Sequence, residues 1–159
     1  MRAIVTVLLW FGVLGCGVIA GLYFAFSSFI MTALSRVGPA GAAAMNSINA
    51  VILQSAFMPL FFGTTVASLA LAVIAALRWN EPGSMLMLTG GLLYVFGMFI
   101  VTMAFNVPLN NALAAAAPAR AEGAEVWTRY LTDWTLWNHV RTIASIGASA
   151  LFVAALLRH

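Results

Sequence analysis

An imidazole and a guanidinium lie close together in the last strongly apolar segment of the chain. His139 and Arg141 are two residues apart, directly after Asn138, in a run that also carries Trp134 and Trp137. Ionisable side chains are costly at membrane depth unless they are paired or hydrated, so they often mark functional sites there. A neutral imidazole can remove a proton, and a guanidinium with an amide can stabilise the resulting anion. The run therefore predicts acid–base and electrostatic chemistry.

The sequence offers few residues that could bind a metal or a cofactor. A metal site needs three or four ligands from His, Cys, Asp or Glu, whereas the apolar segments offer one histidine, the single cysteine Cys16 and no acid. Haem could use His139 as an axial ligand, but the sequence suggests no second ligand other than a methionine. Phosphate loops, Gly-rich nucleotide turns and nucleophile elbows are missing from the sequence. We therefore expect no metal and no organic cofactor.

Structural roles are the alternative for each residue of the run. Arg141 could pair with Asp133 or extend to the headgroups, and His139 could be a buried imidazole with satisfied hydrogen bonds. Trp137 could belong to an aromatic belt at the membrane surface. A functional interpretation requires other polar groups to converge on the same place.

The composition places these residues in a membrane. Of the 159 residues, 64% are hydrophobic and 7% are charged, and the mean hydropathy is +1.03. A water-soluble domain of this length could not bury so much apolar surface. The net charge of +3 is too small and too scattered to indicate nucleic-acid binding. We expect lipid as a partner and, because arginine replaces lysine in a chain rich in alanine and glycine, a bacterial cytoplasmic membrane.

Four apolar stretches are long enough to span a bilayer as helices, which requires about 20 residues each. They cover residues 3–34, 48–78, 84–106 and 136–157. Pro59 is expected to kink the second helix. An even number of spans places both termini on one side, which we predict to be cytoplasmic. The predicted fold class is all-α: an integral membrane four-helix transmembrane bundle, with one domain over residues 1–159.

The connection 107–135 indicates a short helical cap between the third and fourth helices. Pro108 should lie near the start of an Ala-rich helix that Pro118 ends, and residues 122–130 should form a second short helix. The final span should then be capped by Asp133 or Thr135. In the first span, Gly17 and Gly21 favour close packing inside the bundle, with a homo-oligomer as the alternative.

Helical spacing and connectivity bring polar side chains to one end of the bundle. On the last span Trp134, Asn138 and Arg141 share one stripe, and His139 and Thr142 form the adjacent stripe. The neighbouring ends of the other three spans supply further polar and aromatic groups. Those expected at this end are Tyr23, Asn49, Gln54, Asn106 and Asn110, with Ser27 and Thr102 beside them.

Three motifs follow one another through most of the chain. They are Ala20-Gly21-Leu22-Tyr23-Phe24-Ala25-Phe26, Phe105-Asn106-Val107-Pro108-Leu109-Asn110 and the run from Trp134 to Thr142. Together, over about residues 15–155, the chain resembles the DUF1772, or anthrone oxygenase-like, family of small four-helix membrane proteins. The resemblance implies conversion of anthrones to anthraquinones with dioxygen, without a metal or organic cofactor.

The residues suit such a reaction, because an anthrone is a flat, apolar and weakly acidic molecule. Our hypothesis makes His139 the base that removes a proton, and Arg141 and Asn138 the groups that bind the oxyanion. Asn106 and Asn110 would orient the substrate or His139. The rest of the substrate site would comprise the walls Tyr23, Trp134 and Trp137, together with Asn49, Gln54 and Thr142.

Two alternatives belong to other classes of protein. A small transporter would need a polar path across the membrane, whereas the last three spans are almost purely apolar away from one end. A non-catalytic protein that binds a small hydrophobic ligand would need only the pocket. Turnover, binding without turnover and flux into vesicles distinguish the three.

Overall fold

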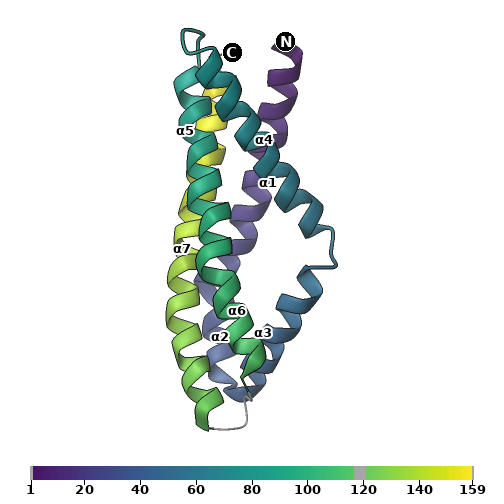
Figure 1. Ribbon diagram of the computed structural model, residues 1–159, viewed down its shortest axis with the longest axis vertical. Coiled ribbons are helices and arrows are strands. Elements are labelled where there is room, and N and C mark those ends of the chain that lie inside the picture. Colours follow the sequence, from purple (N-terminus) through teal and green to yellow (C-terminus); the bar gives the residue numbers. More distant parts are fainter. Residues whose placement is uncertain (1, 117–120, 159) are drawn as a thin grey trace.

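Four long apolar helices run side by side and form the bundle. The computed structural model describes residues 2–116 and 121–158, and this part of the chain is helical with no strand. The helices long and apolar enough to cross a membrane are Arg2–Arg36, Phe57–Leu77, Ser84–Ala115 and Glu122–Leu156. Both ends of the described chain lie at the same end of the bundle (Figure 1). The predicted all-α membrane bundle is confirmed.

The first and third spans each contain segments of wider, π-helical geometry. The first comprises α1 (Arg2–Ala25), the π turn η1 (Phe26–Ile30) and α2 (Met31–Arg36). The third comprises α5 (Ser84–Tyr94), η2 (Val95–Ile100), η3 (Thr102–Asn106) and α6 (Val107–Ala115). All three π segments contact α7 (Ala121–Leu156), the last helix. π turns often occur at functional sites, so this level of the bundle is the place to look for one.

The apolar core lies where α1, α4 (Phe57–Leu77), α5 and α7 pack against one another. Its fully buried side chains come from all four helices and include Leu9, Ile19, Leu71, Tyr94 and Phe152. A second apolar cluster, which includes Met45, Leu113 and Tyr130, lies where α3 (Pro39–Ile52) meets α6 and α7.

The second predicted span is broken into two helices, so its prediction as one kinked helix over 48–78 is wrong. α3 ends at Ile52, α4 begins at Phe57, and the two meet at an elbow on the right of Figure 1. Ser55 makes the break: its hydroxyl donates to the Ile52 carbonyl (2.8 Å) and accepts from the Phe57 amide (3.2 Å). Pro59 therefore lies in the first turn of α4, where a missing N–H costs nothing.

The connection between the third and fourth spans is helical, as predicted, but its helices are not separate elements. α6 continues the third span, because the π turn η3 directly before it accommodates Pro108 without ending the helix. α7 runs unbroken from Ala121, so Asp133 and Thr135 do not cap a helix. Pro118, expected to end the Ala-rich helix, lies outside the described residues.

Candidate active site

Arg141 is a buried cation in the middle of α7. Its side chain is 4% exposed, and its guanidinium carbon lies 4.1 Å from the centroid of the Tyr23 ring and 5.1 Å from that of Trp134. Nη2 donates to Asn138 Oδ1 (2.7 Å), and Nη1 donates to Thr102 Oγ1 (3.4 Å). The third nitrogen, Nε, is buried and has no hydrogen-bond partner among the described residues. Its N–H is therefore available to bind another molecule.

No described carboxylate neutralises this cation. Ion pairs join Arg78 to Glu81 and Arg129 to Asp133, and all four side chains are substantially exposed. Asp133 is thus engaged by Arg129 (3.1 Å), and Arg141 does not extend outward, so both structural roles suggested for Arg141 are wrong. A buried charge without a counterion is costly and favours an anion as partner.

Asn138 holds the cation in place and joins α7 to the first span. It is fully buried, its Oδ1 accepts from Arg141, and its Nδ2 donates to the Tyr23 carbonyl (2.7 Å) and to Ser27 Oγ (2.8 Å). Thr142, also buried, donates to the Asn138 carbonyl (2.8 Å) and lies 3.3 Å from Ser27 Oγ. Both N–H donors of the amide are therefore used within the protein, which leaves the guanidinium as the donor that can bind an anion.

Aromatic rings form the walls beside the cation. Trp134 is buried, meets Phe26 edge to face (5.6 Å between centroids) and stacks on Tyr130 (5.7 Å, 18° between planes). Tyr130 in turn stacks on Trp127 (5.7 Å, 20°), so three rings form a column along α7 that leads to Arg141. Tyr23 faces the guanidinium from the first span. The predicted walls Tyr23 and Trp134 are thus both in contact with Arg141.

The predicted asparagines contact two different rings of the aromatic column, Trp134 and Tyr130. Asn106 is buried, donates to the Trp134 carbonyl (3.2 Å), and its Oδ1 lacks a partner in the described chain. Asn110 and Asn49 meet instead on the hydroxyl of Tyr130, which donates to Asn110 (2.8 Å) and accepts from Asn49 (3.3 Å). Asn106 therefore contacts Trp134, whose ring faces Arg141, whereas Asn49 and Asn110 bind the next ring of the column, Tyr130.

Three predicted site residues lie away from the cation. His139 is exposed on the outside of α7, because two helical steps rotate it by about 200° from Arg141. Gln54 is exposed in the elbow between α3 and α4. Trp137 stacks on the partly exposed Phe105 (3.7 Å, 7°) at the edge of the bundle. The prediction that His139 and Arg141 share one chamber is therefore wrong.

Two further residues complete the surroundings of Tyr23. Met98 is fully buried, and its sulfur lies 3.9 Å from the Tyr23 hydroxyl and 3.8 Å from the Thr102 hydroxyl. Thr102 connects this group to Arg141 and was expected at this end of the bundle, one turn before Asn106. Met98 carries no signal in the sequence, since a methionine in an apolar helix resembles any core residue.

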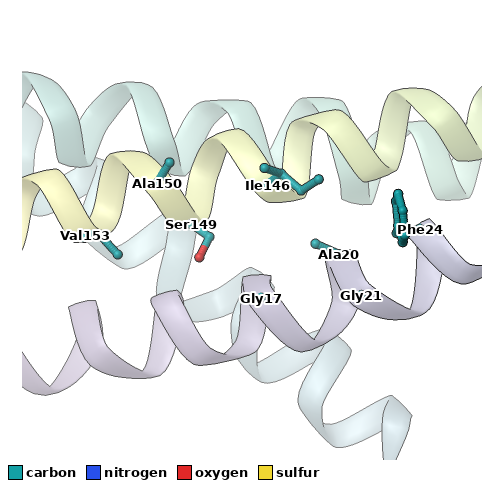
Figure 2. Close-up of a pocket in the computed structure, with 8 residues that line it drawn as sticks. All are labelled: Gly17, Ala20, Gly21, Phe24, Ile146, Ser149, Ala150 and Val153. Atoms are coloured by element: carbon teal, nitrogen blue, oxygen red, sulfur yellow. The ribbon is translucent and has the colours of Figure 1, made fainter.

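A shallow apolar groove of about 440 Å³ runs between α1 and α7 on the outside of the bundle (Figure 2). Gly17 and Gly21 line it, and a Cβ at Gly21 would meet nothing within 4 Å. The expectation that these glycines pack inside the bundle is wrong, because they face outward. Opposite them Figure 2 shows Ile146 and Ser149 of α7.

Comparison with known families gives one match. The model of the family described as Anthrone oxygenase matches residues 54–151, which is more than half of the chain. The matched residues include Asn106, Trp134, Asn138 and Arg141 and begin after Tyr23. Comparison with curated proteins and with solved structures gave no match.

Proposed function

Because this chain belongs to the anthrone oxygenase family, we propose that it oxidises a flat aromatic molecule of the anthrone type with dioxygen, at Arg141. The observation that carries the proposal is a guanidinium that is 4% exposed, has no carboxylate partner in the described chain and lies between two aromatic rings. A flat guest that becomes an anion suits these surroundings, since rings stack and the cation binds the charge.

The proposed reaction begins with loss of a proton from the carbon opposite the ketone. The electron pair left behind spreads through the rings onto the ketone oxygen, which then accepts a hydrogen bond from Arg141. Stabilisation of this oxyanion in a buried site makes the guest a stronger acid. No base of useful strength is found among the residues that contact Arg141, which are Asn138, Thr102, Tyr23 and Trp134. We therefore propose that water accepts the proton.

The remaining steps follow from the electron-rich anion. It passes one electron to dioxygen, and the radical and superoxide combine at the same carbon to form a peroxide. Protonation and loss of water leave a second carbonyl, so one oxygen atom enters the quinone and the other leaves as water. The chain contributes electrostatic stabilisation and orientation, and Asn106, whose Oδ1 has no partner in the described chain, can accept a hydrogen bond from the guest.

Replacement of Arg141 tests this proposal. The variant Arg141→Gln in lipid vesicles should lower anthrone-dependent oxygen uptake and anthraquinone formation roughly 100- to 1,000-fold, as for loss of an oxyanion donor. Arg129→Gln is the matched control, because Arg129 lies on the same helix with its charge exposed. Undiminished turnover in Arg141→Gln would rule out Arg141 as the oxyanion group. Binding of anthrone without turnover in the unaltered protein would favour a non-catalytic carrier.

A further inference from the structure

Arg141 keeps its charge inside the bundle before any anion arrives, because a guanidinium is not deprotonated in proteins. Its side chain is 4% exposed, and it forms no ion pair with any described carboxylate. Asn138 and Thr102 accept hydrogen bonds from two of its nitrogens but carry no negative charge. A buried cation is costly, so another group must compensate for its lost hydration.

Two aromatic rings present their faces to this cation. The guanidinium carbon lies over the Tyr23 ring, 4.1 Å from its centroid, and over the Trp134 ring, 5.1 Å from its centroid. The face of an aromatic ring carries negative potential, and a cation within about 6 Å of the centroid is attracted to it. Both rings are buried, so water screens this attraction little. The two rings are therefore the groups that can compensate for the lost hydration.

Contacts with other residues fix both rings in these positions. The Tyr23 ring meets Phe57 edge to face, with 6.4 Å between centroids, and the Tyr23 carbonyl accepts from Asn138 (2.7 Å). Trp134 is the last ring of the column along α7, and its carbonyl accepts from Asn106 (3.2 Å). Because the surrounding bundle sets the place of each ring, the rings can set the place of the guanidinium.

We infer that Tyr23 and Trp134 together take the place of a counterion and position Arg141 before the guest binds. A carboxylate in their place would compete with an oxyanion for the guanidinium, whereas a neutral ring face stabilises the cation and leaves it able to bind an anion. The buried Nε, which has no partner among the described residues, fits this role. The inference rests on the proposed function for the identity of the anion, and it makes both rings positioning residues.

Double-mutant cycles, measured by thermal unfolding in detergent without substrate, test the role of the rings. Tyr23→Leu and Trp134→Leu should each lower the melting temperature by roughly 4–8 °C more with Arg141 present than in the uncharged variant Arg141→Met. Tyr23→Phe keeps the ring face and should keep this coupling. Phe152→Leu is the matched control, because Phe152 is a fully buried ring about 16 Å further along α7, and its loss should be equal in both backgrounds. Equal losses at either Tyr23 or Trp134 would show ordinary packing and overturn the inference.

Steady-state kinetics of Tyr23→Leu separates a positioning residue from a substrate wall. Loss of positioning should lower kcat for anthrone roughly 10- to 100-fold with KM nearly unchanged, because Arg141 acts on charge that develops during the reaction. Tyr23→Phe should retain most of kcat. A raised KM with unchanged kcat would make Tyr23 a wall for the guest and overturn the positioning role. If the unaltered protein does not turn over anthrone, the proposed function fails, whereas the thermal cycles still decide the role of the rings.

Discussion

Arg141 and His139 are two residues apart in the chain but lie on different sides of α7. Each residue of an α-helix is rotated by about 100° from the one before, so Asn138 and Arg141 face inward while His139 faces out. The inward stripe of Trp134, Asn138 and Arg141 was predictable from this period alone. By the same period His139 lies about 100° from Asn138 but about 200° from Arg141, so the expected polar sector of two adjacent stripes was too broad to keep His139 inside the bundle.

Replacement of His139 tests whether the catalytic base is His139, as the sequence predicted, or water. His139→Ala should retain oxygen uptake with anthrone within about twofold, because the imidazole is exposed and away from the cation. The measurement is the initial rate of oxygen consumption in vesicles, normalised to folded protein. A loss comparable to that of Arg141→Gln would restore His139 as the base and require a different arrangement of α7 during turnover.

Asn138 has a positioning role that stability can reveal. Asn138→Leu keeps the side-chain size but leaves Arg141 Nη2 and the Tyr23 carbonyl without their partner. The free energy of unfolding should fall by about 2–4 kcal/mol, because buried polar groups would lose their hydrogen bonds. Thermal unfolding in detergent measures the change. Asn111→Leu is the control, since Asn111 is exposed on α6, and an equal loss there would refute the positioning role.

At the scale of elements, the interruptions of the helices determine where the site lies. The π segments η1 and η3 contribute Ser27, Thr102 and Asn106, which bond to α7. The π segment η2 contributes Met98, which contacts Tyr23. Apolar length was sufficient to predict four spans. It could not predict the elbow, because the capping hydrogen bonds of Ser55 decide whether Pro59 kinks a helix or begins one.

The elbow can be tested by comparing Ser55 with Pro59. Ser55→Ala should lower the free energy of unfolding by about 1 kcal/mol, since it removes the bond to the Phe57 amide at the start of α4. Pro59→Ala should change it by less than about 0.5 kcal/mol, because a first-turn proline gives up no hydrogen bond. Thermal unfolding of the two variants side by side gives the answer. A large effect at Pro59 with none at Ser55 would instead indicate a continuous, kinked helix.

At the scale of the whole molecule, the two termini lie at one end (Figure 1), and Arg141 lies near the middle of α7. Connectivity was enough to predict that Tyr23 and Asn106 meet the last span, since consecutive spans reverse direction. Met98 could not be predicted, and neither could the outward position of Gly17 and Gly21, because apolar helix faces look alike in the sequence whether they meet protein or lipid.

The cytoplasmic location of the termini stays a prediction that reporter fusions can check. A reporter active only in the cytoplasm should give signal at both the N- and the C-terminus, because four spans return the chain to its starting side. Signal at one terminus alone would contradict the bundle. Signal at neither would reverse the orientation and leave the fold unchanged.

The ring column of Trp127, Tyr130 and Trp134 makes this protein its own optical probe. Its nearly parallel chromophores, 5.7 Å apart, couple to one another, so the near-ultraviolet circular dichroism depends on their spacing and tilt. Because the last ring also faces the guanidinium, any guest that displaces Trp134 changes this spectrum. Binding of a guest beside Arg141 can therefore be followed by near-ultraviolet circular dichroism, without a label and before any product accumulates.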